Sequence, residues 1–231
     1  MFIKSIHTYV AIIGALALFQ ANARAEDLVN QTASVSLGYV IAKYKLSASN
    51  VDQTIDSDTL KLKGAYSRLL NLKYVLFSTA QLYKVTMADS ATNSEKNELM
   101  GGLEVGVRYL INPRFSATLS GELQRLVFFK ANNTTVSGGG HWSPTISAAG
   151  FYQAISRERF SIIPSVKASL ILGAGDSKTG IAYLVNATYN HYLPELRLSA
   201  SLGYESRTQK YNELKLTESG PQLTVGVGKS F

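Results

Sequence analysis

Apolar and polar residues alternate with a period of two along most of this chain. In the segment 98–111, for example, Leu103, Val105 and Val107 are separated by single polar or small residues. Successive side chains leave a β-strand on opposite faces, so the alternation predicts strands with one apolar and one polar face. Ten segments show the pattern: 32–45, 58–67, 72–85, 98–111, 115–129, 142–154, 160–172, 181–192, 196–205 and 221–231.

Two of these segments depart from simple alternation. In 72–85, Val75 and Phe77 fall on the otherwise polar face, so the apolar side of this strand is ambiguous. In 160–172, Pro164 lies on the apolar face and lacks the N–H group that a ladder hydrogen bond needs. This proline predicts a β-bulge.

The connections between the segments alternate between long and short. Five long and four short connections join ten strands and leave both chain ends on the short side. Long loops at one end and short turns at the other are the layout of a bacterial outer-membrane barrel, which has an even number of strands. The long connections are 47–56, 86–97, 130–140, 173–179 and 206–220, and the short ones are 68–71, 112–114, 156–159 and 193–195.

The predicted fold is therefore all-β: a transmembrane, antiparallel, up-and-down β-barrel of about ten strands, with eight or twelve as the alternatives. In lipid, every backbone N–H and C=O group needs a partner within the protein, and a sheet supplies it only when closed. A soluble β-sandwich would also alternate, but it would not sort its connections into two length classes. The strand number depends most on 206–220, which is long enough to hide an extension of its neighbours.

The N-terminal residues have the pattern of a secretory signal peptide. Lys4 precedes an apolar run from 10 to 19, and small residues before position 26 supply a cleavage site. The run is too short for a membrane-spanning helix, which needs about 20 residues. We therefore expect a signal peptide at 1–25 and an outer-membrane β-barrel domain at 26–231.

The composition narrows the partners and the chemistry. Without Lys4 and Arg24, 21 basic residues face 16 acidic ones, a net charge of +5 with no block of like charges. This mild excess predicts no nucleic-acid partner. The chain has no cysteine and therefore no disulfide framework. No histidine and carboxylate cluster has metal-ligand spacing, so we predict neither a metal nor another cofactor.

The C-terminal segment GPQLTVGVGKSF carries a resemblance to a known family. Leu223, Val225, Val227 and Phe231 fall on one side of the predicted last strand. The chain resembles the small outer-membrane β-barrel proteins of Gram-negative bacteria, in which periplasmic chaperones and the barrel-assembly machinery read a terminal phenylalanine after alternating apolar residues. Lys229 departs from the family pattern, which has an apolar residue there, although a lysine can carry its amine into water.

The resemblance implies a location as well as a fold. We expect the protein in the bacterial outer membrane, with its long loops outside and its termini in the periplasm. Outer-membrane lipids and lipopolysaccharide are then its expected partners. The resemblance implies no activity, because barrels of one architecture perform many functions.

The polar face of the strands is expected to line the lumen. It consists mostly of Ser, Gly, Thr and Ala, which fill a ten-stranded barrel poorly and predict a hydrated conduit. If Ile111 pairs with Phe115 in the hairpin through 112–114, Glu104 lies directly opposite Glu122. Either a positive charge is then expected between them, from Lys63 or Lys167, or one of the two carboxyl groups holds a proton. The predicted lumen charges, with a net charge of +3, are Lys61, Lys63, Glu104, Arg108, Glu122, Lys167 and Arg197. They would either bias a pore toward anions or form a salt-bridge network that braces the wall.

A catalytic site is the less favoured interpretation. His141 and Ser143 have the His-x-Ser spacing of the lipid A deacylases, which are outer-membrane barrel esterases. The match ends there, because Pro144 follows where that family has Asn. Alternation also points His141 and Ser143 into the barrel and away from a lipid substrate. We therefore assign no catalytic residue.

Three functions remain. The leading one is a narrow, weakly anion-biased passive pore for small ions or solutes. The second is a structural or surface-interaction barrel, of the adhesin kind, whose lumen is closed by salt bridges. The third is a lipid-directed hydrolase.

Overall fold

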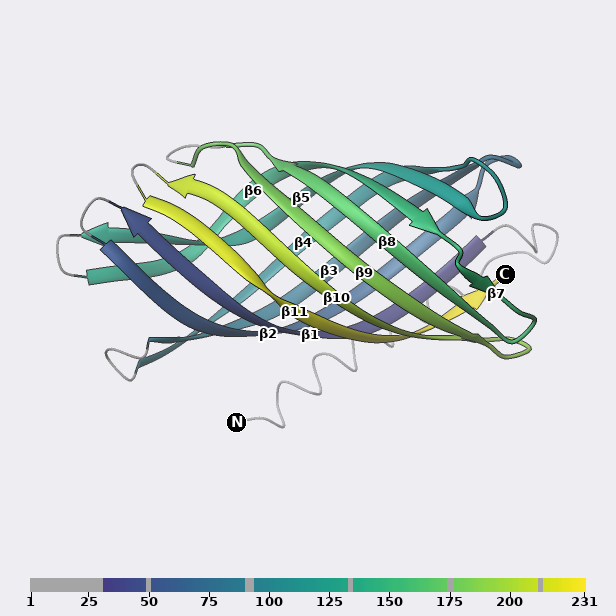
Figure 1. The fold of residues 1–231 in the computed structure, drawn as a ribbon, viewed down its shortest axis with the longest axis horizontal. Helices are drawn as coiled ribbons and strands as arrows, with labels where there is room; N and C mark the ends of the chain where they lie inside the picture. The colour runs from purple at the N-terminus through teal and green to yellow at the C-terminus, as the bar shows by residue number, and fades with distance from the viewer. Residues whose placement is uncertain (1–30, 49–50, 90–93, 133–134, 174–176, 212–213) are drawn as a thin grey trace.

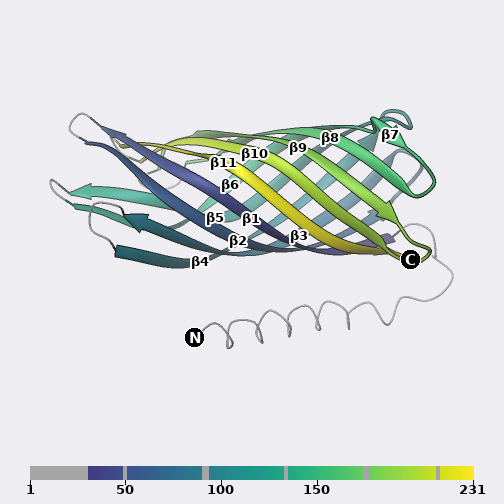
Figure 2. The same ribbon diagram turned by 60° about the horizontal axis from the view of Figure 1, so that its bottom comes forward.

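The protein is a barrel of antiparallel strands, seen from two sides in Figures 1 and 2. A computed structural model describes residues 31–48, 51–89, 94–132, 135–173, 177–211 and 214–231, so the predicted signal peptide lies outside it. Within these ranges, no helix is long and apolar enough to cross a bilayer. The strands are β1 (Gln31–Ala48), β2 (Val51–Leu69), β3 (Tyr74–Asp89), β4 (Ser94–Leu110), β5 (Phe115–Asn132), β6 (Thr135–Tyr152), β7 (Ile155–Ser156), β8 (Phe160–Ile171), β9 (Gly180–Tyr192), β10 (Arg197–Tyr211) and β11 (Leu214–Ser230).

Two pairings close this sheet. Strands adjacent in sequence lie side by side, β1 pairs with β11, and β6 pairs with β8. The wall is thus a closed ring of ten strands, as predicted, and the two-residue β7 continues the edge of β6 along β8. Closure gives the backbone groups of both end strands a partner, which an open sheet in lipid would lack.

The predicted bulge lies where β6 gives way to β7. Between the rungs Phe151–Ser165 and Ile155–Ile162, three residues of one edge face two residues of β8. One of these two is Pro164. An extra residue on one strand defines a β-bulge. The ladder is interrupted there, so the proline, which has no N–H group to donate, is tolerated at this position.

The described ends of the chain meet at the end of the barrel that carries the short turns (Figure 1). The Gln31 and Phe231 backbones exchange two hydrogen bonds, of 2.9 and 3.3 Å between N and O. Lys229, which departs from the family pattern, lies 3.8 Å from a carboxylate oxygen of Glu195 in the turn between β9 and β10. The lysine amine therefore reaches the polar end of the barrel.

Most of the predicted long loops are strand. A loop was expected at 47–56, but β1 continues to Ala48 and β2 begins at Val51. A loop was also expected at 206–220, but β10 continues to Tyr211 and β11 begins at Leu214. The segments 86–97 and 130–140 are likewise largely strand, and only 173–179 lies between strand ends as predicted. The predicted strands were too short because they ended where the outward apolar residues end.

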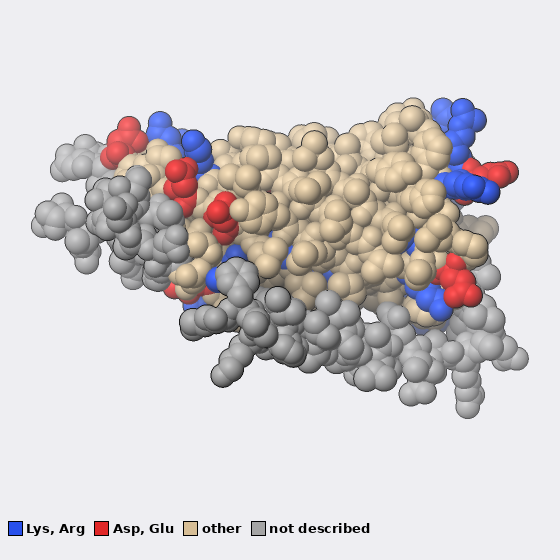
Figure 3. Space-filling model, turned by 90° about the horizontal axis from the view of Figure 1, so that it is seen from below, with Lys and Arg blue, Asp and Glu red and all other residues tan. Residues whose placement is uncertain are grey.

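An apolar belt surrounds the middle of the barrel. Figure 3 shows uncharged atoms across the centre of one face, with Lys, Arg, Asp and Glu gathered at the two ends. Outward side chains such as Leu103 (64% exposed) and Leu119 (64% exposed) form this belt. Aromatic residues lie toward its borders, with Tyr109 near a short turn and Trp142 toward the opposite end. An apolar band with aromatic borders is the surface that a bilayer solvates.

The inward face changes character along the strands. In β1, Ser34 and Ser36 face inward near the short turns, whereas Tyr44 and Leu46 are the inward and fully buried residues near the other end. The inward Tyr83 of the ambiguous strand β3 is buried as well. The barrel therefore has an inner half with a polar interior and an outer half with an apolar interior.

Candidate functional site: the barrel lumen

The inner half of the lumen is lined by small residues. β5 and β6 pair with Ser120 opposite Ser147, and both side chains are buried on the inward face. Ser147 in turn contacts Ser169 of β8, with 2.8 Å between the hydroxyl oxygens. These small hydroxyl side chains are the lumen lining that the sequence predicts.

Three charged side chains meet above this lining. Glu104 of β4 and Glu122 of β5 are direct register partners. The Lys167 amine, from β8 on the other side of β6, lies 2.9 Å from Glu104 Oε1 and 3.7 Å from Glu122 Oε2. The lysine thus occupies the position expected between the two carboxylates, and its charge offsets the repulsion between them. Gln81 of β3 adds a hydrogen bond of 2.6 Å to Glu122.

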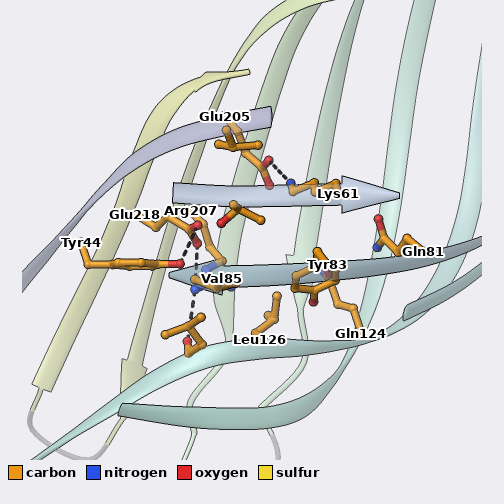
Figure 4. Close-up of a pocket in the computed structure, with 13 residues that line it drawn as sticks. Tyr44, Lys61, Gln81, Tyr83, Val85, Gln124, Leu126, Glu205, Arg207 and Glu218 are labelled. Atoms are coloured by element: carbon orange, nitrogen blue, oxygen red, sulfur yellow. Dashed lines mark hydrogen bonds and ion pairs between the residues drawn. The ribbon is translucent and has the colours of Figure 1, made fainter. Parts of the chain in front are cut away.

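Two further ion pairs cross the wall nearer the outer half. The Lys61 amine lies 3.2 Å from Glu205 Oε2, which joins β2 to β10 across the two strands between them. Arg207 of β10 pairs with Glu218 of β11 at 2.9 Å, and the Arg207 side chain is only 5% exposed. Tyr44 donates a hydrogen bond of 3.0 Å to the same carboxylate. Figure 4 shows these groups pointing toward one another.

The sequence pattern missed Glu205, Arg207 and Glu218. Arg207 and Glu218 fall in the segment 206–220, which was predicted as a loop, and Glu205 ends the strand predicted before it. The inward alternation Gly203, Glu205, Arg207 was the signal that pointed to a longer strand. Adding the three missed charges reduces the net charge of the predicted lumen set from +3 to +2.

The other predicted lumen residues form no ion pair among the described side chains. Arg108 lies with its guanidinium carbon 4.5 Å from the centre of the Phe151 ring. Arg197 is the register partner of Gly228, and Lys63 is the partner of the inward Gln81. These three cations therefore line the lumen wall and do not belong to the salt-bridge set.

The outer half of the lumen is filled with apolar side chains, which corrects the prediction of a hydrated conduit along the whole barrel. The cluster draws on strands from both sides of the ring. Polar side chains such as Arg207 and Gln209 lie among these residues, but both are buried, so this half is not the open, hydrated conduit that was predicted. The buried members are Tyr44, Leu46, Ile55, Tyr83, Val85, Met87, Met100, Val127, Tyr211, Leu214 and Leu216, with Phe128 packed against them.

One hairpin covers this cluster. β5 and β6 pair with each other as far as Asn132–Thr135. The ladder between β4 and β5 nevertheless ends at Gly102–Gln124, although β4 continues to Ser94. We call residues 125–132 and 135–143 the outer hairpin, because in the described ranges their only strand pairing is with each other.

Within the part of the chain that the structure describes, the second edge of the outer hairpin also has no strand partner. The ladder between β6 and β8 ends at Thr145–Ile171. The last contact is the 2.8 Å hydrogen bond from the Leu172 N–H to the Pro144 carbonyl. The N–H and C=O of one strand residue point to the same side, so Pro144 lacks its donor on the side that faces β8.

Side chains from β3 and β10 hold the outer hairpin against the lumen. Arg207 donates a hydrogen bond of 3.2 Å to the Val127 carbonyl, and the Tyr83 hydroxyl donates to the Arg125 carbonyl. The Phe128 ring packs on the Tyr211 ring with 5.5 Å between the centroids. A cavity of about 50 Å³ remains beneath the hairpin, lined by the ion pairs and by Val127 among others (Figure 4).

His141 and Ser143 lie at the base of the outer hairpin, facing inward as predicted. The His141 ring stands edge-on to the rings of Phe128 and Tyr211, at 6.2 and 6.4 Å between centroids. Among the described residues, no hydrogen bond joins His141 to a carboxylate, and no group of His, Cys, Asp or Glu is arranged to hold a metal ion. His141 therefore has an aromatic environment without the acid that would orient a catalytic base.

A closed ring of ten strands with an apolar belt is the architecture of transmembrane β-barrels. The outer membrane protease OmpT from Escherichia coli has this fold, at 13% identity and a TM-score of 0.55 over 87% of this chain and 97% of OmpT. An outer membrane channel from Pseudomonas putida F1 has it at 10% identity and a TM-score of 0.52, over 90% of this chain and 99% of the channel. No family model and no curated protein sequence matches the chain.

These similarities concern the fold alone. One neighbour is a protease and the other is a channel, so the shared architecture does not select an activity. The choice between the predicted functions therefore depends on the lumen of this chain.

Proposed function

We propose that the protein is an outer-membrane channel for small solutes, held closed by the outer hairpin. The apolar belt and the fold support the membrane location. The observation that carries the channel proposal is the release of the outer hairpin from both neighbouring strands. A segment that served only to brace the wall would keep its ladder to β4, because paired backbone groups stabilise a sheet.

The two halves of the lumen have different parts in this proposal. The small polar side chains of the inner half form a vestibule that water can fill. The ion pairs and the apolar cluster form the barrier, and the hairpin is the part of the barrier that can move. A net charge of +2 on the ten lumen residues named above gives the open channel a weak preference for anions.

Single-channel recording in planar bilayers tests the proposal. We expect the wild-type protein to be mostly closed with brief openings. Tyr83→Phe removes one hydrogen bond to the hairpin, and a hydrogen bond contributes roughly 1 kcal/mol. The ratio of open to closed time should then rise about fivefold. The double variant Arg207→Met/Glu218→Gln removes the second hydrogen bond without leaving a buried charge unpaired, and it should increase opening further.

Crosslinking supplies the matched control, since the chain has no native cysteine. Phe128→Cys/Tyr211→Cys, bridged by a short thiol reagent, should abolish openings until the bridge is reduced. Leu119→Cys/Ala148→Cys joins β5 to β6 below the outer hairpin, at paired outward positions, and should leave the current unchanged. Absence of current from the wild type and from both release variants would reject the channel.

That negative result would favour the second candidate, a structural or surface-interaction barrel with a closed lumen. The tightly buried apolar cluster and the Arg207–Glu218 pair are the observations that support it. The lipid-directed hydrolase has no comparable support, given the aromatic surroundings of His141.

A further inference from the structure

A lysine-rich surface lies on the outward face of three adjacent strands in the outer half. Lys210 of β10 and Lys215 of β11 are direct register partners, and both are exposed. Lys45 of β1 faces Thr217, two residues from Lys215 along β11, so it is a diagonal neighbour on the same face. Like charges directly opposite each other destabilise a sheet unless an anion lies between them.

The described carboxylates do not supply this anion. In the outer half of these strands, the only ion pair of an outward lysine among the described residues joins Lys43 to Asp56 of β2, at 4.0 Å and with both side chains about 70% exposed. Among the described residues, Lys45, Lys210 and Lys215 form no ion pair. Asp52 of β2 lies opposite Ser47 and is a diagonal neighbour of Lys45, but no ion pair joins the two. The three lysines therefore present positive charge that no ion pair among the described residues neutralises.

Hydroxyl groups lie between these lysines and the apolar belt. Moving from the belt outward, the rows on β10 and β11 are Tyr204 with Pro221, Ser206 with Ser219, Thr208 with Thr217, and Lys210 with Lys215. The Thr208 and Thr217 hydroxyl oxygens are 3.4 Å apart. Each row is two residues, or about 7 Å, from the next. The surface thus changes from apolar to hydroxyl to cationic within six residues along each strand.

We propose that this surface, defined by Lys45, Thr208, Lys210, Lys215 and Thr217, binds the phosphate groups of a phosphorylated outer-leaflet lipid. Lysine amines and threonine hydroxyls are donors to phosphate oxygens, and phosphate would separate the opposed lysines. The acyl chains of the same molecule would lie on the belt below, beside Tyr204. This inference rests on the proposed membrane location and is independent of the proposed channel.

Binding of lipid A to the purified protein in detergent tests this inference. Native mass spectrometry would compare bisphosphorylated lipid A, its dephosphorylated form and inorganic phosphate. The variant Lys45→Gln/Lys210→Gln/Lys215→Gln should bind the bisphosphorylated lipid about 100-fold more weakly. The reason is that three lysines lose their attraction to the anionic headgroup, and each attraction accounts for roughly a fivefold change in affinity. Removing the lipid phosphates should weaken wild-type binding to a similar extent.

The control changes basic residues at the other end of the barrel. Lys73→Gln/Arg114→Gln/Arg157→Gln removes the same charge from the short turns and should leave the affinity within about twofold. All six substituted positions are exposed, so we expect the sheet to stay intact in both variants, which migration of the folded band in gels without heating would verify. Equal binding of lipid A by the two triple variants would overturn the proposal. Displacement of the lipid by inorganic phosphate at equal concentration would assign the surface to free anions instead.

Discussion

β1 crosses both halves of the barrel and has a different interior in each. Near the short turns its inward residues are serines, and the outward Leu37 is 47% exposed on the belt. Near the other end Leu46 faces inward and is 0% exposed, while Lys45 faces outward. β11 repeats the change, with Val225 outward in the inner half and Leu216 inward in the outer half.

The change shows that the surroundings, and not the strand, set which face is apolar. Inside the belt the outer face meets hydrocarbon, so the apolar residues lie outside and the lumen is polar. Beyond the belt the outer face meets water, so burial of apolar area favours the inside instead. The outer half is thus organised like a small soluble β-protein with a core of its own, joined to a membrane barrel.

The largest expected effect is at the boundary between the two halves. Lys167→Met leaves Glu104 and Glu122 adjacent without a cation, and both carboxylates are largely buried. Removal of one partner from such a group costs about 4 kcal/mol. Urea unfolding in detergent, followed by the fluorescence of the single tryptophan, should show this loss. Lys167→Met/Glu104→Gln/Glu122→Gln should recover most of it, and an equally unstable triple variant would show that the charges are not the cause.

Smaller losses of stability are expected for two substitutions on the inward and outward faces of β1. Leu46→Ala removes a side chain from the apolar cluster and leaves a cavity, which costs about 3.5 kcal/mol. Leu37→Ala loses only the transfer free energy, about 2 kcal/mol, because lipid fills the vacated space. The same unfolding measurement gives both values. Equal destabilisation by the two substitutions would mean that the outer half has no rigid core.

The smallest effect concerns ion selectivity. Lys63 forms no ion pair among the described side chains, so Lys63→Glu breaks none of the ion pairs of the barrier, although it removes a longer-range attraction to Glu104 and Glu122. It changes the net charge of the lumen set by two and should move the reversal potential in a salt gradient toward cation selectivity. Lys73→Glu, at an exposed short turn, is the control of equal charge. A reversal potential that moves equally in both variants would place Lys63 outside the conduction path.

The closed barrel, its ten strands and the meeting of Glu104 with Glu122 were predictable from the sequence. All three follow from local rules: a period of two, the alternation of connection lengths, and the register set by a short turn at 112–114. The position of Lys167 was predictable only as one of two candidates. Lys167, and not Lys63, pairs with the two carboxylates because of the distance between β8 and β5 across β6. A pattern of consecutive residues gives no information on that distance.

The outer half was predicted poorly for a specific physical reason. The strands were expected to end near Lys45 and Glu205 because outward apolar residues cease there, yet the strands continue with the faces exchanged. Tyr44 and Leu46 were available as a signal, since they alternate with Lys43 and Lys45 in the opposite phase. The apolar residues move from the outward to the inward face where the strand leaves the bilayer. This change can be interpreted as a continuing strand only when the position of the bilayer border along the strand is known.

The sequence by itself determined that this chain is a membrane-type barrel, because alternation and turn length are properties of consecutive residues. Only the tertiary structure decided that a buried apolar cluster and ion pairs occupy the outer half of the lumen. That arrangement depends on the outer hairpin separating from its neighbour β4 and meeting Arg207 of β10 and Tyr83 of β3. These contacts join residues far apart in the sequence, and no periodic pattern of consecutive residues encodes them.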